Sequence, residues 1–187
     1  MNKSVVLIAL TAGTLLMSGA EPVKNLYANH ELQTYAGKNG TIQIRNHWYQ
    51  GKILEAGKKD GKNAIKFQSI PAGKGNFNAA LSGYAHIDKL PPGKYSMSVW
   101  CLVEPGEKVQ DVQYFHVSLC YKSEKKTRFD SKKYTGSAKP VPGKWFELKD
   151  TFEITADKLD HYFLFGHFGK SPVTAWYAAP SIRKLEK

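Results

Sequence analysis

Long hydrophobic runs are almost missing from this 187-residue sequence. The clearest one, from Val5 to Met17, follows Lys3 and ends at the small residues 18–20. This order of charge, apolar run and small residues is typical of a secretory signal peptide. The run is too short and too interrupted for a permanent membrane span, and no cysteine follows it for lipidation. We therefore expect residues 1–20 to be cleaved after Ala20 and the protein to be secreted or periplasmic.

Helical periodicity is also missing, since no segment of 11 or more residues repeats apolar positions every three to four residues. Short alternating stretches, separated by glycine and proline, occur instead. We predict strands over residues 41–45, 63–67, 79–87, 95–103, 109–121, 145–154, 162–168 and 174–182. Eight to ten such strands predict an all-β fold, a two-sheet antiparallel β-sandwich, formed by residues 21–187 as one domain.

Cysteine is scarce, with only Cys101 and Cys120. If the strands carrying them form a hairpin about the turn at residues 105–106, the two residues lie too far apart for a bridge, which needs Cα atoms within about 7 Å. If the strands belong to different sheets, a disulfide becomes possible, since an exported chain meets an oxidising compartment. Both alternatives stay open at this stage.

Acidic residues are few, 16 against 27 lysines and arginines, so the formal charge is +11. A basic exported protein is attracted to anionic surfaces, including acidic glycans. The alternative is that the lysines only keep the protein soluble, because they are scattered over predicted loops. No nucleic-acid-binding motif is present, so we expect no nucleic-acid partner.

The clearest pattern in the sequence runs from Leu90 to Val103. A Pro-Pro-Gly turn leads into an alternating strand in which Tyr95 and every second residue after it are apolar. We assign that face to the core. The other face carries small hydroxyls and Trp100, whose ring could either bind a sugar or pack beneath neighbouring loops.

Three segments carry a resemblance to known proteins. They are the run from Leu90 to Trp100, the stretch from Gly61 to Phe67, and Gly143 to Leu148 followed by residues 152–154. With the closing strands near residues 166–169 and 176–182, the chain resembles the jelly-roll carbohydrate-binding modules of families four, nine and twenty-two, in the galactose-binding-like sandwich group. The resemblance implies glycan binding without catalysis.

One departure from that family concerns calcium. The last strand of the family usually carries an Asp pair that helps to hold a structural calcium ion, but Ala178 and Ala179 stand at the matching positions here. A hard cation needs several oxygen ligands. We therefore expect no cofactor, with calcium held by other acidic residues as the alternative.

Aromatic rings stack on the C–H faces of sugars, and amides bind their hydroxyls. On the face that the resemblance makes concave, we predict contacts from Trp100, Tyr114 and His116. On loops we predict contacts from Trp48, Tyr49, Asn76 and Asn78. We expect Trp145 and Trp176 to be structural, and His116 has the alternative of an ordinary strand histidine.

Two other functional classes remain open. A glycoside hydrolase needs paired carboxylates, and the best placed, Glu147 and Glu153, are predicted to face solvent. A lyase of acidic polysaccharides needs clustered Tyr, His, Arg and amide side chains, which Tyr114, His116 and Gln113 supply in part. A structural or adhesive surface protein could use the same sandwich only as a scaffold.

Overall fold

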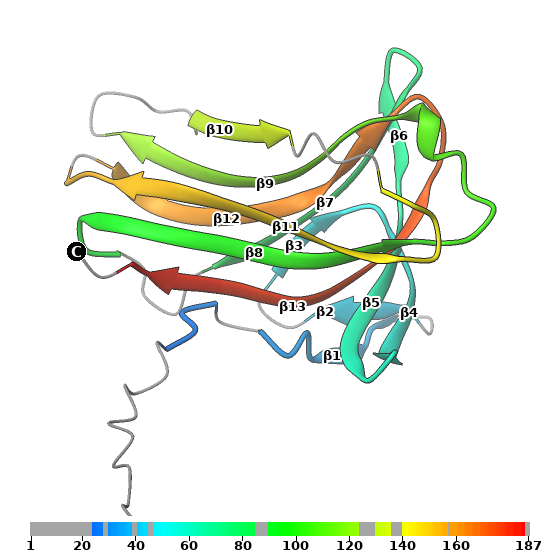
Figure 1. Cartoon of the computed structure of the whole chain (residues 1–187), viewed down its shortest axis with the longest axis horizontal. Coiled ribbons are helices and arrows are strands. Elements are labelled where there is room, and N and C mark those ends of the chain that lie inside the picture. Colours follow the sequence, from blue (N-terminus) through cyan, green and yellow to red (C-terminus); the bar gives the residue numbers. More distant parts are fainter. Residues whose placement is uncertain are drawn as a thin grey trace, which may run out of the picture.

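The computed structural model describes residues 24–27, 30–38, 41–44, 47–84, 90–123, 130–135, 140–156 and 158–185. Two antiparallel sheets stack face to face (Figure 1), which confirms the predicted all-β, two-sheet sandwich. No α-helix occurs within these ranges, and none of their elements is a helix able to span a membrane. The predicted signal peptide lies outside the described residues and stays a prediction.

The six-stranded sheet has the order β10-β9-β12-β7-β3. Its sixth strand, β6, pairs with residues 76–78 of β7, beyond the part of β7 that pairs with β3. Its strands are β3 (His47–Gln50), β6 (Ile70–Gly73), β7 (Asn76–Tyr84), β9 (Val112–Ser123), β10 (Asp130–Thr135) and β12 (Lys158–Gly169). Segments far apart in the chain, such as β7 and β12, are therefore direct neighbours.

The five-stranded sheet has the order β11-β8-β13-β5-β4. Its strands are β4 (Lys52–Lys59), β5 (Lys62–Gln68), β8 (Gly93–Val103), β11 (Trp145–Ile154) and β13 (Thr174–Lys184). A separate pair, β1 (Thr34–Ala36) and β2 (Ile42–Ile44), completes the fold. A tight turn at Asp60 and Gly61 joins β4 to β5, and β4 itself was not predicted.

The stretch that dominates the sequence becomes β8, a central strand between β11 and β13. Its predicted core face is confirmed, because Tyr95, Met97, Val99, Cys101 and Val103 are all fully buried. Burial of a large apolar side chain stabilises the fold by about 1.5–3 kcal/mol. The hydroxyl of Tyr95 donates to the carbonyl of Pro91 at 2.6 Å, which fixes the preceding turn to the strand.

Alternation also orients β9 and β12. Phe115 and Val117 of β9, with Phe163 and Phe165 of β12, are buried in the core between the sheets. The residues between them therefore point away from the five-stranded sheet. The aromatic residues of the predicted strand 162–168 suggest burial on both faces, but this is only partly right, because Leu164 and Phe168 are half-buried on the outer side.

The hairpin considered for the two cysteine strands is wrong. Cys101 lies on β8 and Cys120 on β9, which belong to different sheets. The connection between them includes a 3-10 turn at Val109–Asp111, which carries the chain from one layer to the other. Cys101 is nevertheless a free, buried thiol, and it hydrogen-bonds to the hydroxyl of Tyr177.

The hydroxyl of Tyr177 also forms a hydrogen bond with His167 of the other sheet. His167 Nε2 donates to the Val173 carbonyl at 3.0 Å, so His167 Nδ1 accepts a hydrogen bond from the Tyr177 hydroxyl at 2.6 Å. Burial lowers the pKa of His167 to about 4, so the ring is neutral at pH 7. A neutral polar relay therefore joins the two sheets.

Candidate cleft on the six-stranded sheet

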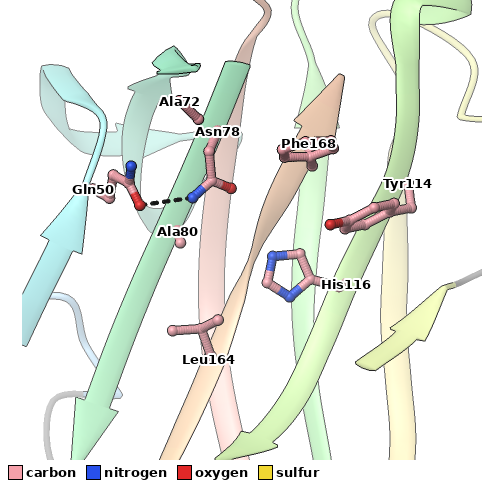
Figure 2. Close-up of a pocket in the computed structure, with 8 residues that line it drawn as sticks. All are labelled: Gln50, Ala72, Asn78, Ala80, Tyr114, His116, Leu164 and Phe168. Atoms are coloured by element: carbon pink, nitrogen blue, oxygen red, sulfur yellow. Dashed lines mark hydrogen bonds between the residues drawn. The ribbon is translucent and has the colours of Figure 1, made fainter. Parts of the chain in front are cut away.

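A cleft of about 350 Å³ opens on the outer face of the six-stranded sheet. This volume lies within the usual range for small-molecule sites. Five strands contribute to the lining, so the cleft crosses most of the sheet (Figure 2). The lining residues are Gln50, Ala72, Asn78, Ala80, Tyr114, His116, Leu164 and Phe168.

Strand register arranges the cleft in rows across the sheet. The first row is Asn78, Phe168 and Tyr114, on three neighbouring strands. The second row is Gln50, Ala80, Gly166 and His116. Because Ala80 and Gly166 are small, the second row forms a trough beside the aromatic first row.

Gly166 is required at the centre of the trough. A Cβ atom there would lie 1.9 Å from the carbonyl oxygen of Ala79 on the neighbouring strand. No side chain other than hydrogen fits without moving backbone. The low floor of the cleft is therefore fixed by close approach of β12 and β7.

Two rings form the aromatic wall. Tyr114 and Phe168 are stacked, with ring centroids 5.3 Å apart and an angle of 15° between their planes. The ring of His116 meets Tyr114 edge-on, with centroids 5.8 Å apart. His116 is only 4% exposed, and its Nδ1 lies 3.1 Å from Ser118 Oγ. These contacts fix the wall before any ligand arrives.

Beside Phe168, on the side of the wall away from Tyr114, lies a pair of amides. Asn78 Nδ2 donates to Gln50 Oε1 at 2.9 Å, as the dashed line in Figure 2 shows. No lysine, arginine, aspartate or glutamate is found among the described residues that line the cleft. A protein of formal charge +11 thus has a cleft whose described lining contains none of its lysines or arginines.

The structure brings together three of the predicted site residues, Tyr114, His116 and Asn78. Tyr49 instead packs against the core, where its ring meets Phe67 edge-on at 6.0 Å. Asn76 lies outside the cleft and accepts a hydrogen bond from Lys170 Nζ at 2.6 Å. The backbone of Trp48 pairs with Ser82, but its side chain lies outside what the structure describes, so its role stays a prediction.

Sequence reasoning missed Gln50, Leu164 and Phe168. Gln50 ends β3, whose residues Trp48 and Tyr49 were predicted to lie on a loop. Leu164 and Phe168 lie on the outer side of an aromatic strand whose composition suggests burial on both faces. The sequence shows that these two residues alternate with core residues, but it does not show that the outer face of their sheet is left open as a cleft.

The predicted grouping of Trp100 with Tyr114 and His116 is wrong, because Trp100 lies on the five-stranded sheet. There it forms an indole cluster with Trp145 and Trp176 on the outer face, around the buried side chain of Leu102. Lys62 Nζ lies 5.8 Å from the ring centroid of Trp100 and 5.6 Å from that of Trp145. The indole cluster thus forms a second, smaller hydrophobic cluster, separate from the core between the sheets.

Polar partners close the indole cluster. Trp145 Nε1 donates to Asp60 Oδ2 at 2.8 Å, and Trp176 Nε1 donates to Glu104 Oε1. Lys66 Nζ lies 3.0 Å from the same Glu104 oxygen. Burial alone would raise the pKa of Glu104, but hydrogen bonds from Trp176 and Lys66, with the nearby lysine charges, lower it. The structural role predicted for Trp145 and Trp176 agrees with these contacts.

Metal ligands are not gathered anywhere in the described ranges, where no group of three or more His, Cys, Asp or Glu side chains could hold an ion. At the position of the family's carboxylate pair, Ala178 is fully buried and Ala179 has a φ of 47°. Neither side chain offers an oxygen, so these residues do not fit a calcium site.

Neither the protein-family models nor the curated proteins include a match to the sequence. Solved structures do match. The C-terminal family 22 carbohydrate-binding module of Clostridium thermocellum Xyn10B is 16% identical, with a TM-score of 0.53, over 87% of this chain and 97% of that one. A xylan-binding domain of family 22 is 15% identical, with a TM-score of 0.52, over 84% and 94%.

A longer structure from the same Clostridium enzyme holds a family 22 module and a catalytic module in complex with xylohexaose. It is 12% identical, with a TM-score of 0.50, and the match covers 87% of this chain but 28% of that one. At these identities the likeness establishes the fold. The chain therefore has the jelly-roll architecture of carbohydrate-binding modules, as the sequence resemblance implied.

Proposed function

We propose that this is an exported, non-catalytic carbohydrate-binding protein, and that the cleft of the six-stranded sheet holds the glycan. One observation carries the proposal: a stacked aromatic wall and an amide pair line a single preformed cleft. The shared fold with family 22 modules supports the same conclusion.

The two parts of the cleft suit the two kinds of sugar surface. Tyr114 and Phe168 offer apolar ring faces, which pack against the C–H groups of a pyranose. Asn78 and Gln50 offer donors and acceptors to its hydroxyls. The wall is already stacked and the amides already paired, so little side-chain freedom is lost when ligand binds.

We further propose that the glycan is neutral in the part that enters the cleft. The described lining has no lysine or arginine to pair with a carboxylate or sulfate, and a buried unpaired charge is costly. Anionic glycans, which the net charge favours, are the alternative. They would be held by the scattered lysines and would dissociate as salt rises.

The test is calorimetric titration with xylohexaose, cellohexaose, mannohexaose and hexagalacturonate at low and physiological salt. We expect one or more neutral hexasaccharides to bind with little salt dependence. Tyr114→Ala should weaken that binding at least tenfold. Tyr35→Ala, which removes an exposed ring of β1 outside the cleft, is the matched control and should leave it unchanged.

The proposal fails if no neutral hexasaccharide binds, or if Tyr114→Ala has no effect. Binding of hexagalacturonate alone, lost at physiological salt, would indicate lysine attraction instead. Absence of binding to every probe would favour the scaffold function.

A lyase of acidic polysaccharides is a second candidate, because the cleft also brings Tyr114, His116 and Asn78 together. Such an enzyme would remove the C5 proton beside the uronate carboxyl group and break the C4–O glycosidic bond. The other chain leaves with that oxygen, which takes up a proton, and a C4–C5 double bond remains in the product. Ultraviolet absorbance of an unsaturated product from polygalacturonate or alginate would favour it over the binding function.

A further inference from the structure

We propose that Asn78 and Gln50 act as one unit that binds two adjacent free hydroxyls of the sugar ring stacked on Phe168. The inference rests on the proposed function and goes further, because it assigns the specificity of the cleft to an amide pair. It also names the class of ligand: a neutral glycan that carries unsubstituted vicinal hydroxyls.

The placement follows from strand register. Asn78 is the direct partner of Phe168 across β7 and β12, so their Cβ atoms are about 4.5–5.5 Å apart. A ring lying on Phe168 therefore turns its edge toward Asn78. Equatorial hydroxyls project from the edge of a pyranose, so they meet the amide pair rather than the aromatic wall.

The hydrogen bond between the amides determines what each still offers. Asn78 Nδ2 donates to Gln50 Oε1, which leaves Asn78 Oδ1 as an acceptor and Gln50 Nε2 as a donor. Neither atom has a hydrogen-bond partner among the described residues. The pair thus presents one acceptor beside one donor, and two neighbouring hydroxyls can satisfy both at once.

Both amides are half-buried in the cleft, so a ligand that covers them must replace the water they bind. A ligand that lacks one hydroxyl, or carries an ester on it, would leave a covered amide unsatisfied. Sites built to hydrogen-bond a hydroxyl discriminate strongly against analogues without it. We therefore expect acetylation of either hydroxyl to weaken binding.

The variant Gln50→Glu separates this function from a structural one. The glutamate keeps an oxygen that accepts from Asn78 Nδ2 but has no Nε2 donor for the ligand. If the pair serves only to stabilise the cleft, Gln50→Glu should bind normally. Asn78→Leu removes the acceptor in a second variant. Gln68→Met, which changes an amide of the five-stranded sheet, is the matched control.

The experiment is calorimetric titration of wild type and variants with the tightest of the neutral hexasaccharides and with its partly acetylated form. We expect Gln50→Glu and Asn78→Leu each to lower affinity at least tenfold, and Gln68→Met less than twofold. Wild type should prefer the free hexasaccharide at least tenfold. That preference should disappear in the Gln50→Glu/Asn78→Leu double variant.

Two results overturn the inference while leaving the proposed function intact: Gln50→Glu binding within threefold of wild type, or a double variant that keeps the preference for free hydroxyls. Failure of wild type to bind any neutral hexasaccharide overturns the proposed function and this inference together. Thermal unfolding of each variant checks that it is folded, and Gln50→Glu, the milder change, decides the matter if Asn78→Leu does not fold.

Discussion

The outer faces of the two sheets carry similar residue types but differ in what covers them. On the six-stranded sheet, Tyr114 and Phe168 stand beside the small residues Ala80 and Gly166, so a cleft remains. On the five-stranded sheet, the indole cluster fills the corresponding face around Leu102. One face has room for a ligand, whereas the other is packed by its own side chains.

The β4–β5 hairpin accounts for much of the difference. Its turn supplies Asp60, which accepts from Trp145, while Lys59 and Lys62 lie over the indole rings. A long-range segment thus occupies a position that a ligand could otherwise take. Aromatic residues on an outer face indicate a binding site only where no such segment reaches them.

The largest expected effect tests this contrast with one substitution on each face, one expected to lower stability and the other to lower glycan affinity. Trp176 is 3% exposed, so Trp176→Ala should lower the free energy of unfolding by about 3–5 kcal/mol and leave glycan affinity unchanged in the folded protein. Phe168→Ala should lower affinity at least tenfold with a smaller loss of stability. Urea unfolding and calorimetry measure the two quantities.

The reverse pattern, in which Trp176→Ala abolishes binding while Phe168→Ala only destabilises, would mean that the two faces have been assigned the wrong way round.

The next effect concerns the relay that joins the sheets through His167, Tyr177 and Cys101. The folded-state pKa of His167 is about 4, below the unfolded value of about 6.5, so the unfolded chain takes up the proton first. Stability from this group is present above pH 6.5 and is lost as pH falls toward 4. We expect a loss of about 2–3 kcal/mol between pH 7 and pH 4.5.

Urea unfolding at the two pH values measures that loss. His167→Gln cannot titrate and should show a smaller difference between them. An equal difference in the variant would mean that other groups set the acid sensitivity.

A smaller effect is expected from filling the trough. Ala80→Leu places a larger side chain between Gln50 and His116, so glycan affinity should fall at least tenfold, about 1.4 kcal/mol. Ala36→Leu, at an exposed position of β1, is the control. Calorimetry that showed full affinity in Ala80→Leu would place the ligand elsewhere.

The smallest expected effect tests the cation–π contacts that Lys62 makes with the indole cluster. Lys62→Met keeps the aliphatic stem but removes the ammonium from two rings, so stability should fall by about 0.5–1 kcal/mol. Lys149→Met, at an exposed position of β11, should change it less. Equal effects of the two substitutions in urea unfolding would show that the cation adds nothing here.

The sequence allowed the sandwich and the core face of β8 to be predicted, because strict alternation from Tyr95 to Val103 leaves few other solutions. It also predicted Tyr114, His116 and Asn78 as site residues. It could not place Trp100, because the hairpin that encloses that face is distant in sequence. Gln50 and Phe168 were missed for a related reason: their roles depend on the register of β3, β7 and β12.

The location of the ligand can be measured directly by nuclear magnetic resonance, with the tightest of the neutral hexasaccharides added to isotopically labelled protein. We predict that the side-chain amide signals of Gln50 and Asn78 shift on binding, while the indole N–H signals of Trp100, Trp145 and Trp176 do not. Shifts confined to the three indoles, with the two amides unaffected, would contradict the assignment of the cleft.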